Sequence, residues 1–524
     1  MNRKHDQRTH MNKEVIIIGA GPGGLAAAII LAASGVRVKV IERSGKIGGR
    51  TTSLELGDYK FDVGPTFFLY PRVLEEIFQL AGTSMNRELE LVRLDPQYRI
   101  LFGKGGHIDA TPNVAEMERQ IARLAPADAP GFSRFMAENR AKMAAMEPCL
   151  ETSYSGWRDL LSARLLKLLP MLRPHQSIDT YLKRFFRDER VRLSFCFQSK
   201  YLGMSPFRCP SLFSILSFLE YEHGVFHPIG GCSEITRAMA RVAQRCGAEI
   251  LLDEPVEEIL FEGRRAVGVR TATEVHRADG VVINGDFARA MGTLVPDRLR
   301  QRWSNRRIAK KKFSCSTFML YLGIDGQYDL PHHNIYIARD YEQNLRDIEH
   351  RHVLSEEPSF YVQNASVTDP TLAPRGQSAL YVLVPVTHQH ENVDWTVEAP
   401  RYRELALTQL AKAGFADIRR RIRAEKMITP AQWDRDFHIH LGATFNLAHS
   451  LDQLLHLRPR NRFEDLDGVY LVGGGTHPGS GLPVIFESAR ISSRLLLEDF
   501  GMQLASREAT TVDAAEELPL LETA

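Results

Sequence analysis

The sequence predicts an α/β fold built on a parallel sheet, and two glycine-rich strings are the main observations behind this prediction. Near the N-terminus of the 524-residue chain, the apolar run 15–18 leads into GAGPGG at 19–24 and then into a second apolar run at 38–41. Near the other end, the apolar run 469–472 leads into GGGTHPGSGLP at 473–483. A strand, a glycine turn and a helix are predicted at both places.

The first string has the spacing Gly-x-Gly-x-x-Gly, formed by Gly19, Gly21 and Gly24, and Glu42 ends the next predicted strand. In this arrangement the first glycine permits a tight turn, the second lets the backbone approach a pyrophosphate, and the third lets helix and strand pack closely. The helix N-terminus attracts the pyrophosphate, and the carboxylate accepts hydrogen bonds from a ribose hydroxyl. The string therefore predicts a dinucleotide site.

The same stretch has two other interpretations. Residues 15–36 carry no charge and are long enough for a membrane span, and Arg3, Lys4 and Arg8 match the basic start of a signal peptide. However, the glycines at 19, 21, 23 and 24 interrupt the apolar block where a spanning helix favours leucine or isoleucine. Because a dinucleotide site explains these glycines, it is the preferred interpretation.

Two further features agree with a nucleotide site. The pair Gly48-Gly49 lets backbone come close to a ligand, and Arg50 adds a permanent cation beside it. Pro483 occupies the favoured first turn of a predicted helix, whose N-terminus stabilises nearby negative charge. The two halves of the site lie far apart in sequence, so the domain that holds them is expected to be discontinuous.

Several strings resemble a known family. Glu42-Arg43, GGR at 48–50 and FDVGP at 61–65 resemble the start of the FAD-binding amine-oxidase and carotenoid-desaturase superfamily. THPGSGLP at 476–483 and GVFHPIGG at 224–231 are similar to signatures of bacterial phytoene and diapophytoene desaturases. The resemblance covers nearly the whole chain and implies a non-covalent FAD. The residues expected at this cofactor are Gly19, Gly21, Gly24, Glu42, Arg43, Gly49, Arg50, Pro65, Thr66, Val256, Gly474, Gly481, Leu482, Pro483 and Val484.

Three positions depart from the patterns of the superfamily or the family. Gly474 stands where many flavoproteins of the superfamily carry an aspartate for the ribityl chain, which carotenoid desaturases usually lack. His227 and Cys232 replace the commoner tyrosine and methionine. The first departure strengthens the resemblance to the desaturases, and the other two leave the substrate open.

The middle of the chain predicts a different organisation. Helices are expected at 132–146 and 178–197, two strands, a turn at 262–264 and a third strand within 248–269, and further strands at 313–324, 359–367 and 379–386. The resemblance implies a Rossmann-type, glutathione-reductase-like FAD-binding domain, a mixed antiparallel-sheet substrate domain and a helical membrane-associating region. The expected division is FAD-binding at 11–115, 231–300 and 441–503, helical at 116–230, substrate-binding at 301–440, and a disordered tail at 504–524.

Composition limits the remaining classes. The formal net charge of +2 argues against a nucleic-acid-binding protein. The six cysteines show no zinc spacing and indicate free thiols in a reducing compartment. The histidine pairs 332–333, 388/390 and 438/440 lack recurring carboxylate or cysteine partners, so no metal site is predicted.

The resemblance implies a linear C30 or C40 polyene precursor, from which the flavin removes a hydride as a proton also leaves. Such a hydrocarbon is bound through apolar area in a long channel. The aromatic residues considered for the channel wall, each equally explained by core packing, are Phe67, Phe68, Tyr70, Phe213, Phe218, Tyr221 and Phe226. No second nucleotide string is present, so a membrane quinone or oxygen is expected as electron acceptor.

A lipid-soluble substrate favours a cytoplasmic enzyme attached peripherally to a membrane. The amphipathic segment 160–173 and the basic cluster 306–312 are candidates for contact with an anionic bilayer, although solvated faces explain them equally well. Three other activities stay open on the same fold: a terminal-methyl oxygenase of diapolycopene type, a carotenoid isomerase, and a non-enzymatic isoprenoid-binding escort. The desaturase is preferred to the escort because the flavin strings are retained.

Overall fold

The computed structural model describes residues 13–154, 156, 170–171, 173 and 175–505. Within this part of the chain, a parallel sheet has the strand order β10-β2-β1-β14-β20. Its strands are β1 (Glu14–Ile18), β2 (Arg37–Ile41), β10 (Glu249–Leu251), β14 (Gly280–Ile283) and β20 (Val469–Leu471). The sheet thus combines strands from both ends and the middle of the chain, as the two glycine strings imply.

Helix α2 (Pro22–Ala33) follows β1 and is buried along nearly its whole length. It packs between α19 (Leu482–Asp499) and α12 (Ser233–Arg245), and α3 (Arg72–Leu80) also contacts it. A helix that is apolar all round belongs either in a protein core or in a bilayer. Here these helices and strands β1 and β2 pack around α2, so residues 15–36 belong to the core of the fold and form neither a membrane span nor the apolar part of a signal peptide.

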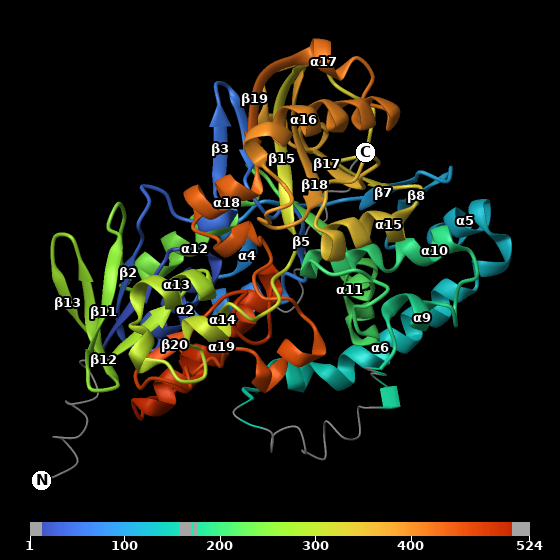
Figure 1. Cartoon of the computed structure of the whole chain (residues 1–524). Coiled ribbons are helices and arrows are strands. Elements are labelled where there is room, and N and C mark those ends of the chain that lie inside the picture. The colour runs from blue at the N-terminus through green and yellow to red at the C-terminus, as the bar shows by residue number, and fades with distance from the viewer. Residues whose placement is uncertain (1–12, 155, 157–169, 172, 174, 506–524) are drawn as a thin grey trace, which may run out of the picture.

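A second, mixed sheet lies above the parallel sheet in Figure 1 and has the strand order β19-β15-β18-β17-β16-β7-β8. All its neighbouring pairs are antiparallel except β16 with β7. The strands are β7 (Tyr98–Phe102), β8 (His107–Ala110), β15 (Ser316–Asp325), β16 (His333–Ile337), β17 (Phe360–Asn364), β18 (Gln377–Val386) and β19 (Ile422–Ile428). The strands predicted at 313–324, 359–367 and 379–386 are confirmed, whereas residues 98–110 join this sheet although the sequence placed them with the N-terminal FAD segment.

Three small sheets accompany the two large ones. The predicted turn at 262–264 joins β11 to β12, with Gly263 at φ +63°. The strands of the small sheets are β3 (Ser53–Leu56), β4 (Tyr59–Asp62), β5 (Phe68–Leu69), β6 (Leu91–Arg93), β9 (Val225–Pro228), β11 (Val256–Glu262), β12 (Arg265–Thr271) and β13 (Val275–Arg277).

Helices form the lower right of Figure 1, where α6 (Gly131–Leu150) confirms the helix predicted at 132–146. The single helix predicted at 178–197 is wrong. The chain there forms α9 (Ile178–Leu182) and α10 (Glu189–Ser194), separated by a turn.

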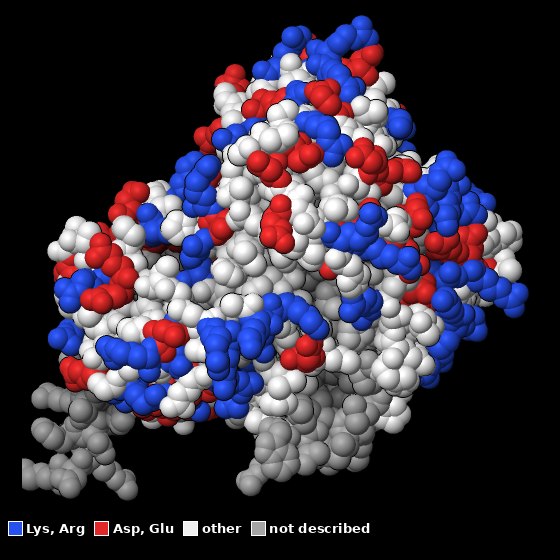
Figure 2. Space-filling view, in the orientation of Figure 1, with Lys and Arg blue, Asp and Glu red and all other residues white. Residues whose placement is uncertain are grey.

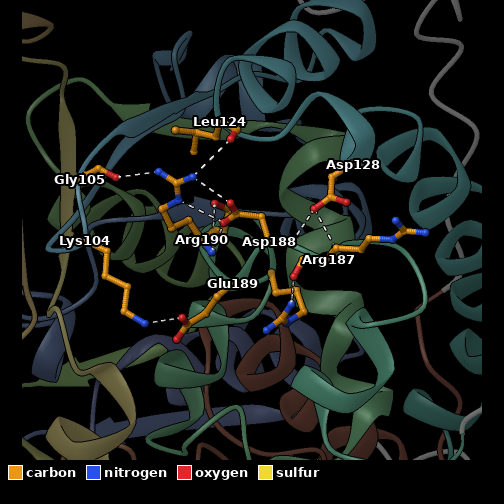
Figure 3. Close-up of polar contacts among 10 residues, drawn as sticks. Lys104, Gly105, Leu124, Asp128, Arg187, Asp188, Glu189 and Arg190 are labelled. Carbon is orange, nitrogen blue, oxygen red and sulfur yellow. Dashed lines mark hydrogen bonds and ion pairs between the residues drawn. The ribbon is translucent and has the colours of Figure 1, made fainter.

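Figure 3 shows why this helix breaks. The Asp128 carboxylate accepts the backbone N–H of Arg187 at 2.8 Å and of Asp188 at 2.7 Å, which removes both groups from helical hydrogen bonding. Asp188 then caps α10 by accepting the N–H of Arg190 at 2.8 Å. An acidic side chain from a distant loop therefore decides the boundary, which no local pattern predicts.

The remaining helices complete the layers. Helix α16 (Trp395–Lys412) covers the apolar core on one face of the mixed sheet. The others are α4 (Met85–Glu88), α5 (Val114–Leu124), α11 (Ile215–His223), α13 (Phe287–Leu294), α14 (Asn305–Ile308), α15 (Tyr341–Arg346), α17 (Ile418–Arg421) and α18 (Pro430–Phe437). Among the described residues, no helix combines the length and apolarity needed to cross a bilayer.

Candidate functional site

A cavity of about 1050 Å³ lies where the parallel sheet, the mixed sheet and the helices meet. Its volume is at the upper end of the range for ligand sites. Every residue that the sequence predicts at the cofactor lines this cavity, with the single exception of Gly24. Segments from residue 19 to residue 484 are thus brought together around one space.

Gly24 is absent from the lining because it forms the packing beneath the turn. A Cβ at Gly24 would lie 2.1 Å from the carbonyl oxygen of Gly19, so only glycine lets α2 sit this close to β1. Gly19 itself has φ +101° and accepts a hydrogen bond from Asn284 Nδ2 at 3.0 Å. Asn284 follows β14 and lines the cavity, a role that the sequence analysis did not predict although a polar residue after a parallel strand is a usable signal.

The glycine turn at 19–24 and the pair Gly48-Gly49 lie next to each other at the wall of the cavity. A Cβ on Gly49 would lie 3.6 Å from the Cα of Gly21, and Gly48 N–H donates to the Ala20 carbonyl at 2.8 Å. Without side chains between them, both backbones border the cavity at the N-terminus of α2. This is the geometry that a pyrophosphate needs.

Arg50 lies at the same end of the cavity and donates to the Thr444 carbonyl. Burial lowers the pKa of its guanidinium, and the nearby Asp286 carboxylate opposes this shift. Asp286 caps α13 by accepting Arg289 N–H at 3.0 Å and lines the cavity as well. A cation and a carboxylate are therefore both held at the cavity surface, available to polar groups of a cofactor.

Glu42 stabilises the backbone of the glycine turn, in addition to its predicted role at the ribose. Its Oε2 accepts the N–H of Ala20 at 2.8 Å, and its Oε1 accepts the N–H of Ser44 at 3.0 Å. The carboxylate is buried and lines the cavity. Glu42 therefore holds the backbone of the glycine turn by a hydrogen bond, and it lies at the place where a ribose hydroxyl is expected.

The C-terminal string closes the opposite side of the cavity. Gly481 precedes α19 with φ +116°, and Leu482, Pro483 and Val484 form the first turn of this helix beside the cavity. At Gly474, a Cβ would lie 2.6 Å from Ser480 Oγ. The position is too crowded for an aspartate unless Ser480 moves, which accounts physically for the departure seen in the sequence.

Arg458 holds this C-terminal segment in place through hydrogen bonds to its backbone. The sequence did not predict this role. Its fully buried guanidinium donates to the carbonyls of Gly474 at 2.7 Å, Thr476 at 3.1 Å and Leu447 at 3.1 Å. Burial lowers its pKa to about 9. A lone arginine in a loop offers no local signal for this role, because its acceptors lie 11–18 residues away in other segments.

The far end of the cavity is apolar. Helix α11 contributes Leu216 and Leu219 to the lining, and α6 contributes Met146 and Leu150. Of the aromatic candidates for a channel wall, Phe67, Tyr70 and Phe213 line the cavity. The other four, Phe68, Phe218, Tyr221 and Phe226, are buried in the core and absent from the lining, so ordinary core packing explains them.

These features test whether a flavin dinucleotide fits. The turn at Gly19–Gly24 leaves a helix N-terminus open to the cavity, α19 presents a second N-terminus, and Glu42 borders the first. Both helix N-termini attract negative charge, such as a pyrophosphate or a reduced flavin ring. The residues present therefore fit the group, and the apolar end beyond it fits a hydrocarbon.

Comparisons with known proteins agree with this geometry. The family of flavin-containing amine oxidoreductases matches residues 22–497. A 4,4'-diapophytoene desaturase (4,4'-diapolycopene-forming) from Methylomonas sp is 44% identical over 486 residues, covering 92% of this chain and 95% of that protein. An all-trans-zeta-carotene desaturase from Myxococcus xanthus is 42% identical, covering 93% and 94%.

Solved structures share the fold at low identity. A cyclohexylamine oxidase from Brevibacterium oxydans has a TM-score of 0.57 at 17% identity, covering 94% of this chain and all of that one. A Rab GDI from Plasmodium falciparum has a TM-score of 0.54 at 13% identity, covering 94% and 99%. Likeness at such low identity concerns the fold alone, because proteins as differently named as an amine oxidase and a Rab GDI share it.

The family match and the high identity to the two desaturases cover nearly the whole chain. They confirm the resemblance to carotenoid desaturases that the sequence showed, the flavin cofactor FAD and the assignment as an oxidoreductase. The chain therefore belongs to the carotenoid desaturase family of the flavin-containing amine oxidoreductases.

Proposed function

We propose that this protein is an FAD-dependent desaturase of a linear C30 or C40 carotenoid precursor of the phytoene or diapophytoene type. The observation that carries the proposal is the continuity of one cavity from the glycine turn at Gly19 to the apolar face of α11 at Leu216 and Leu219. Relatives that are 44% and 42% identical to it are named as a 4,4'-diapophytoene desaturase and an all-trans-zeta-carotene desaturase. Bound at Gly19–Gly24 and at the start of α19, FAD supplies the site that accepts a hydride from the substrate.

The chain's own residues provide binding and orientation. A polyene offers no charge or hydrogen-bond acceptor, so its affinity depends on apolar area, at roughly 25 cal/mol per Å² removed from water. Phe67 and Phe213 with the leucines of α11 supply this area. The apolar wall also holds adjacent carbons of the substrate in register with the flavin and excludes water.

We further propose that FAD is bound by the cofactor residues predicted from the sequence, together with Asn284 and Asp286, which line the same cavity. We also propose that the FAD-binding, helical and substrate-binding regions follow the predicted ranges, except that residues 98–110 belong to the mixed sheet. A membrane quinone or oxygen is the proposed electron acceptor.

The protein is proposed to act at a membrane surface from the cytoplasm. Most of the amphipathic segment 160–173 lies outside the described residues, so the support comes from the cluster 306–312. Arg306, Arg307 and Lys310 are exposed there, and Figure 2 shows a blue patch over α14. Liposomes with anionic lipid should bind the protein and release part of it at high salt.

The other activities on this fold differ in their products. A terminal-methyl oxygenase adds oxygen, an isomerase leaves the number of double bonds unchanged, and an isoprenoid escort converts nothing. The cavity retains the glycine turn and both helix N-termini for a flavin, which favours a redox activity over the escort.

Co-expression with a phytoene supply or a diapophytoene supply tests the proposal. We expect additional conjugated double bonds in the extracted pigment, with no added oxygen in its mass. Gly24→Val is the negative control, because its side chain would collide with the Gly19 carbonyl beneath the cofactor turn. Unchanged precursor beside an FAD-loaded wild-type protein would refute the proposed function.

A further inference from the structure

A buried chain of hydrogen bonds leaves the cavity between its cofactor end and its apolar end. Thr66 Oγ1 lies 2.8 Å from the Tyr361 hydroxyl oxygen, and this hydroxyl lies 2.8 Å from His333 Nδ1. Thr66 and Tyr361 line the cavity, whereas His333 lies behind them and is fully buried. The chain thus begins at the wall of the cavity and ends at a base.

Tyr361 lines the cavity between a predicted cofactor residue and the apolar wall. It neighbours Thr66 from the predicted cofactor set, and its ring packs 5.5 Å from that of Phe67 in the apolar wall. If Thr66 donates to the Tyr361 oxygen and Tyr361 donates to His333, one lone pair of this oxygen stays available to the cavity.

His333 presents a neutral imidazole to the Tyr361 hydroxyl. Burial, together with the nearby His227, lowers its pKa well below the usual range, so the imidazole is neutral at pH 7. Its Nε2 has no hydrogen-bond partner within the described part of the chain. The Phe67 ring stacks on the imidazole at 4.1 Å and 12°, and this ring face favours the cation that forms on protonation.

A row of imidazoles continues from His333 toward a carboxylate. The His332 ring lies 4.4 Å from that of His333, and the His227 ring lies 4.6 Å from that of His332. His227 Nε2 lies 3.0 Å from Asp369 Oδ2, and hydrogen bonds to His227, Thr371 and Gly230 outweigh burial and lower the pKa of Asp369 to about 2. The row therefore ends at an ionised carboxylate, which attracts a proton that enters at His333.

We propose that Tyr361 accepts the proton that leaves the substrate during desaturation, while its own hydroxyl proton passes to His333 Nδ1. This inference rests on the proposed function. The substrate C–H bond breaks as a new O–H bond forms on Tyr361, and the old O–H bond breaks as an N–H bond forms on His333. The electron pair of the C–H bond becomes the new double bond, and the hydride from the adjacent carbon goes to FAD.

In this scheme Tyr361 is the catalytic residue, because it lines the cavity and takes the proton from the substrate directly. His333 is a positioning residue, because it acts through the Tyr361 hydroxyl. A neutral acceptor pair suits this cavity, since a permanent charge beside a hydrocarbon would be poorly solvated before the reaction.

The scheme is tested by single-turnover reduction of the bound FAD in the absence of oxygen. The reductant is phytoene or diapophytoene supplied in liposomes. Tyr361→Phe keeps the ring and removes the hydroxyl, and we expect reduction to slow by about 10²-fold with FAD affinity unchanged. His333→Asn keeps an acceptor near the Nδ1 position but is not a base, so the scheme expects a similar loss. Recovery of the wild-type rate in His333→Asn would show that a hydrogen bond suffices and would overturn the proton transfer.

Tyr328→Phe is the matched control, because it also removes a buried tyrosine hydroxyl, which donates 2.7 Å to the Ala416 carbonyl outside the cavity. It should reduce FAD at the wild-type rate. A wild type that never reduces its FAD with any such substrate refutes the proposed function itself. A wild type that does so, beside a Tyr361→Phe variant that is equally fast, refutes only the role of Tyr361.

Nitrogen NMR of histidine-labelled protein gives a readout without turnover. His333, assigned by its loss in His333→Asn, should carry its proton on Nε2 and accept at Nδ1 from Tyr361. The Nδ1 shift should change in Tyr361→Phe and not in Tyr328→Phe. A proton found on Nδ1 would reverse the hydrogen bond and overturn the scheme.

Discussion

Replacing Glu220 with glutamine should make the protein more stable than the wild type, increasingly so as the pH rises. Glu220 is fully buried in α11, behind the apolar end of the cavity. Its Oε2 accepts hydrogen bonds from the Tyr98 hydroxyl at 2.9 Å and from Gln198 Nε2 at 3.0 Å. No positive side chain contributes to its pKa, and burial raises that pKa to about 7 from the ordinary 4.5.

The size of the effect follows from the two pKa values. Between pH 4.5 and about 7 the folded protein keeps a proton on Glu220 that the unfolded chain has already released. The free energy of unfolding therefore falls as the pH rises through this range and levels off above it. The shift corresponds to about 3 kcal/mol. Glutamine has no proton to lose, so Glu220→Gln should gain about this amount on the wild type between pH 4.5 and 8.

Guanidinium unfolding of FAD-saturated protein, followed by circular dichroism at several pH values, measures the difference. Asp62 is a second buried carboxyl with a raised pKa of about 6, but it is present in both proteins and its effect cancels. Glu391→Gln, at an exposed position, is the matched control for the same substitution without burial. A difference between Glu220→Gln and wild type that stays constant from pH 4.5 to 8 would refute a raised pKa at Glu220.

Four further substitutions test the site. Gly24→Val should abolish FAD binding, seen as a colourless purified protein, because its side chain collides with the Gly19 carbonyl. Arg50→Ala should weaken FAD by about 1.5–3 kcal/mol in a fluorescence titration, and unchanged affinity would remove Arg50 from the site. Arg458→Met should lower the free energy of unfolding by at least about 3 kcal/mol in denaturant titrations, since it leaves several buried carbonyls unpaired. Leu216→Trp should slow turnover of a C40 substrate in product assays while FAD content stays normal, because it narrows the apolar end.

The N-terminal half of the cofactor site could be predicted from the sequence because its physical requirements are local. Gly19, Gly21 and Gly24 are needed within one turn, and their spacing alone predicts the strand, the turn and the helix. The strand that ends before Gly473 and the helix that begins with Pro483 were predicted for the same reason. Such signals lie within a few residues of one another, so one sequence is enough to see them.

Long-range contacts decided the rest. Arg458 and Asn284 reach carbonyl groups of other segments, and Asp128 breaks a predicted helix from a distant loop. The hydrogen bonds that join Thr66, Tyr361 and His333 span about 300 residues of sequence, so no local pattern contains them. Whether an aromatic residue lines the cavity or fills the core also depends on packing. Phe67 lines the cavity, whereas the adjacent Phe68 is buried in the core. The sequence by itself determined the cofactor turn and the family, and only the tertiary structure decided which buried polar groups meet beside the apolar cavity.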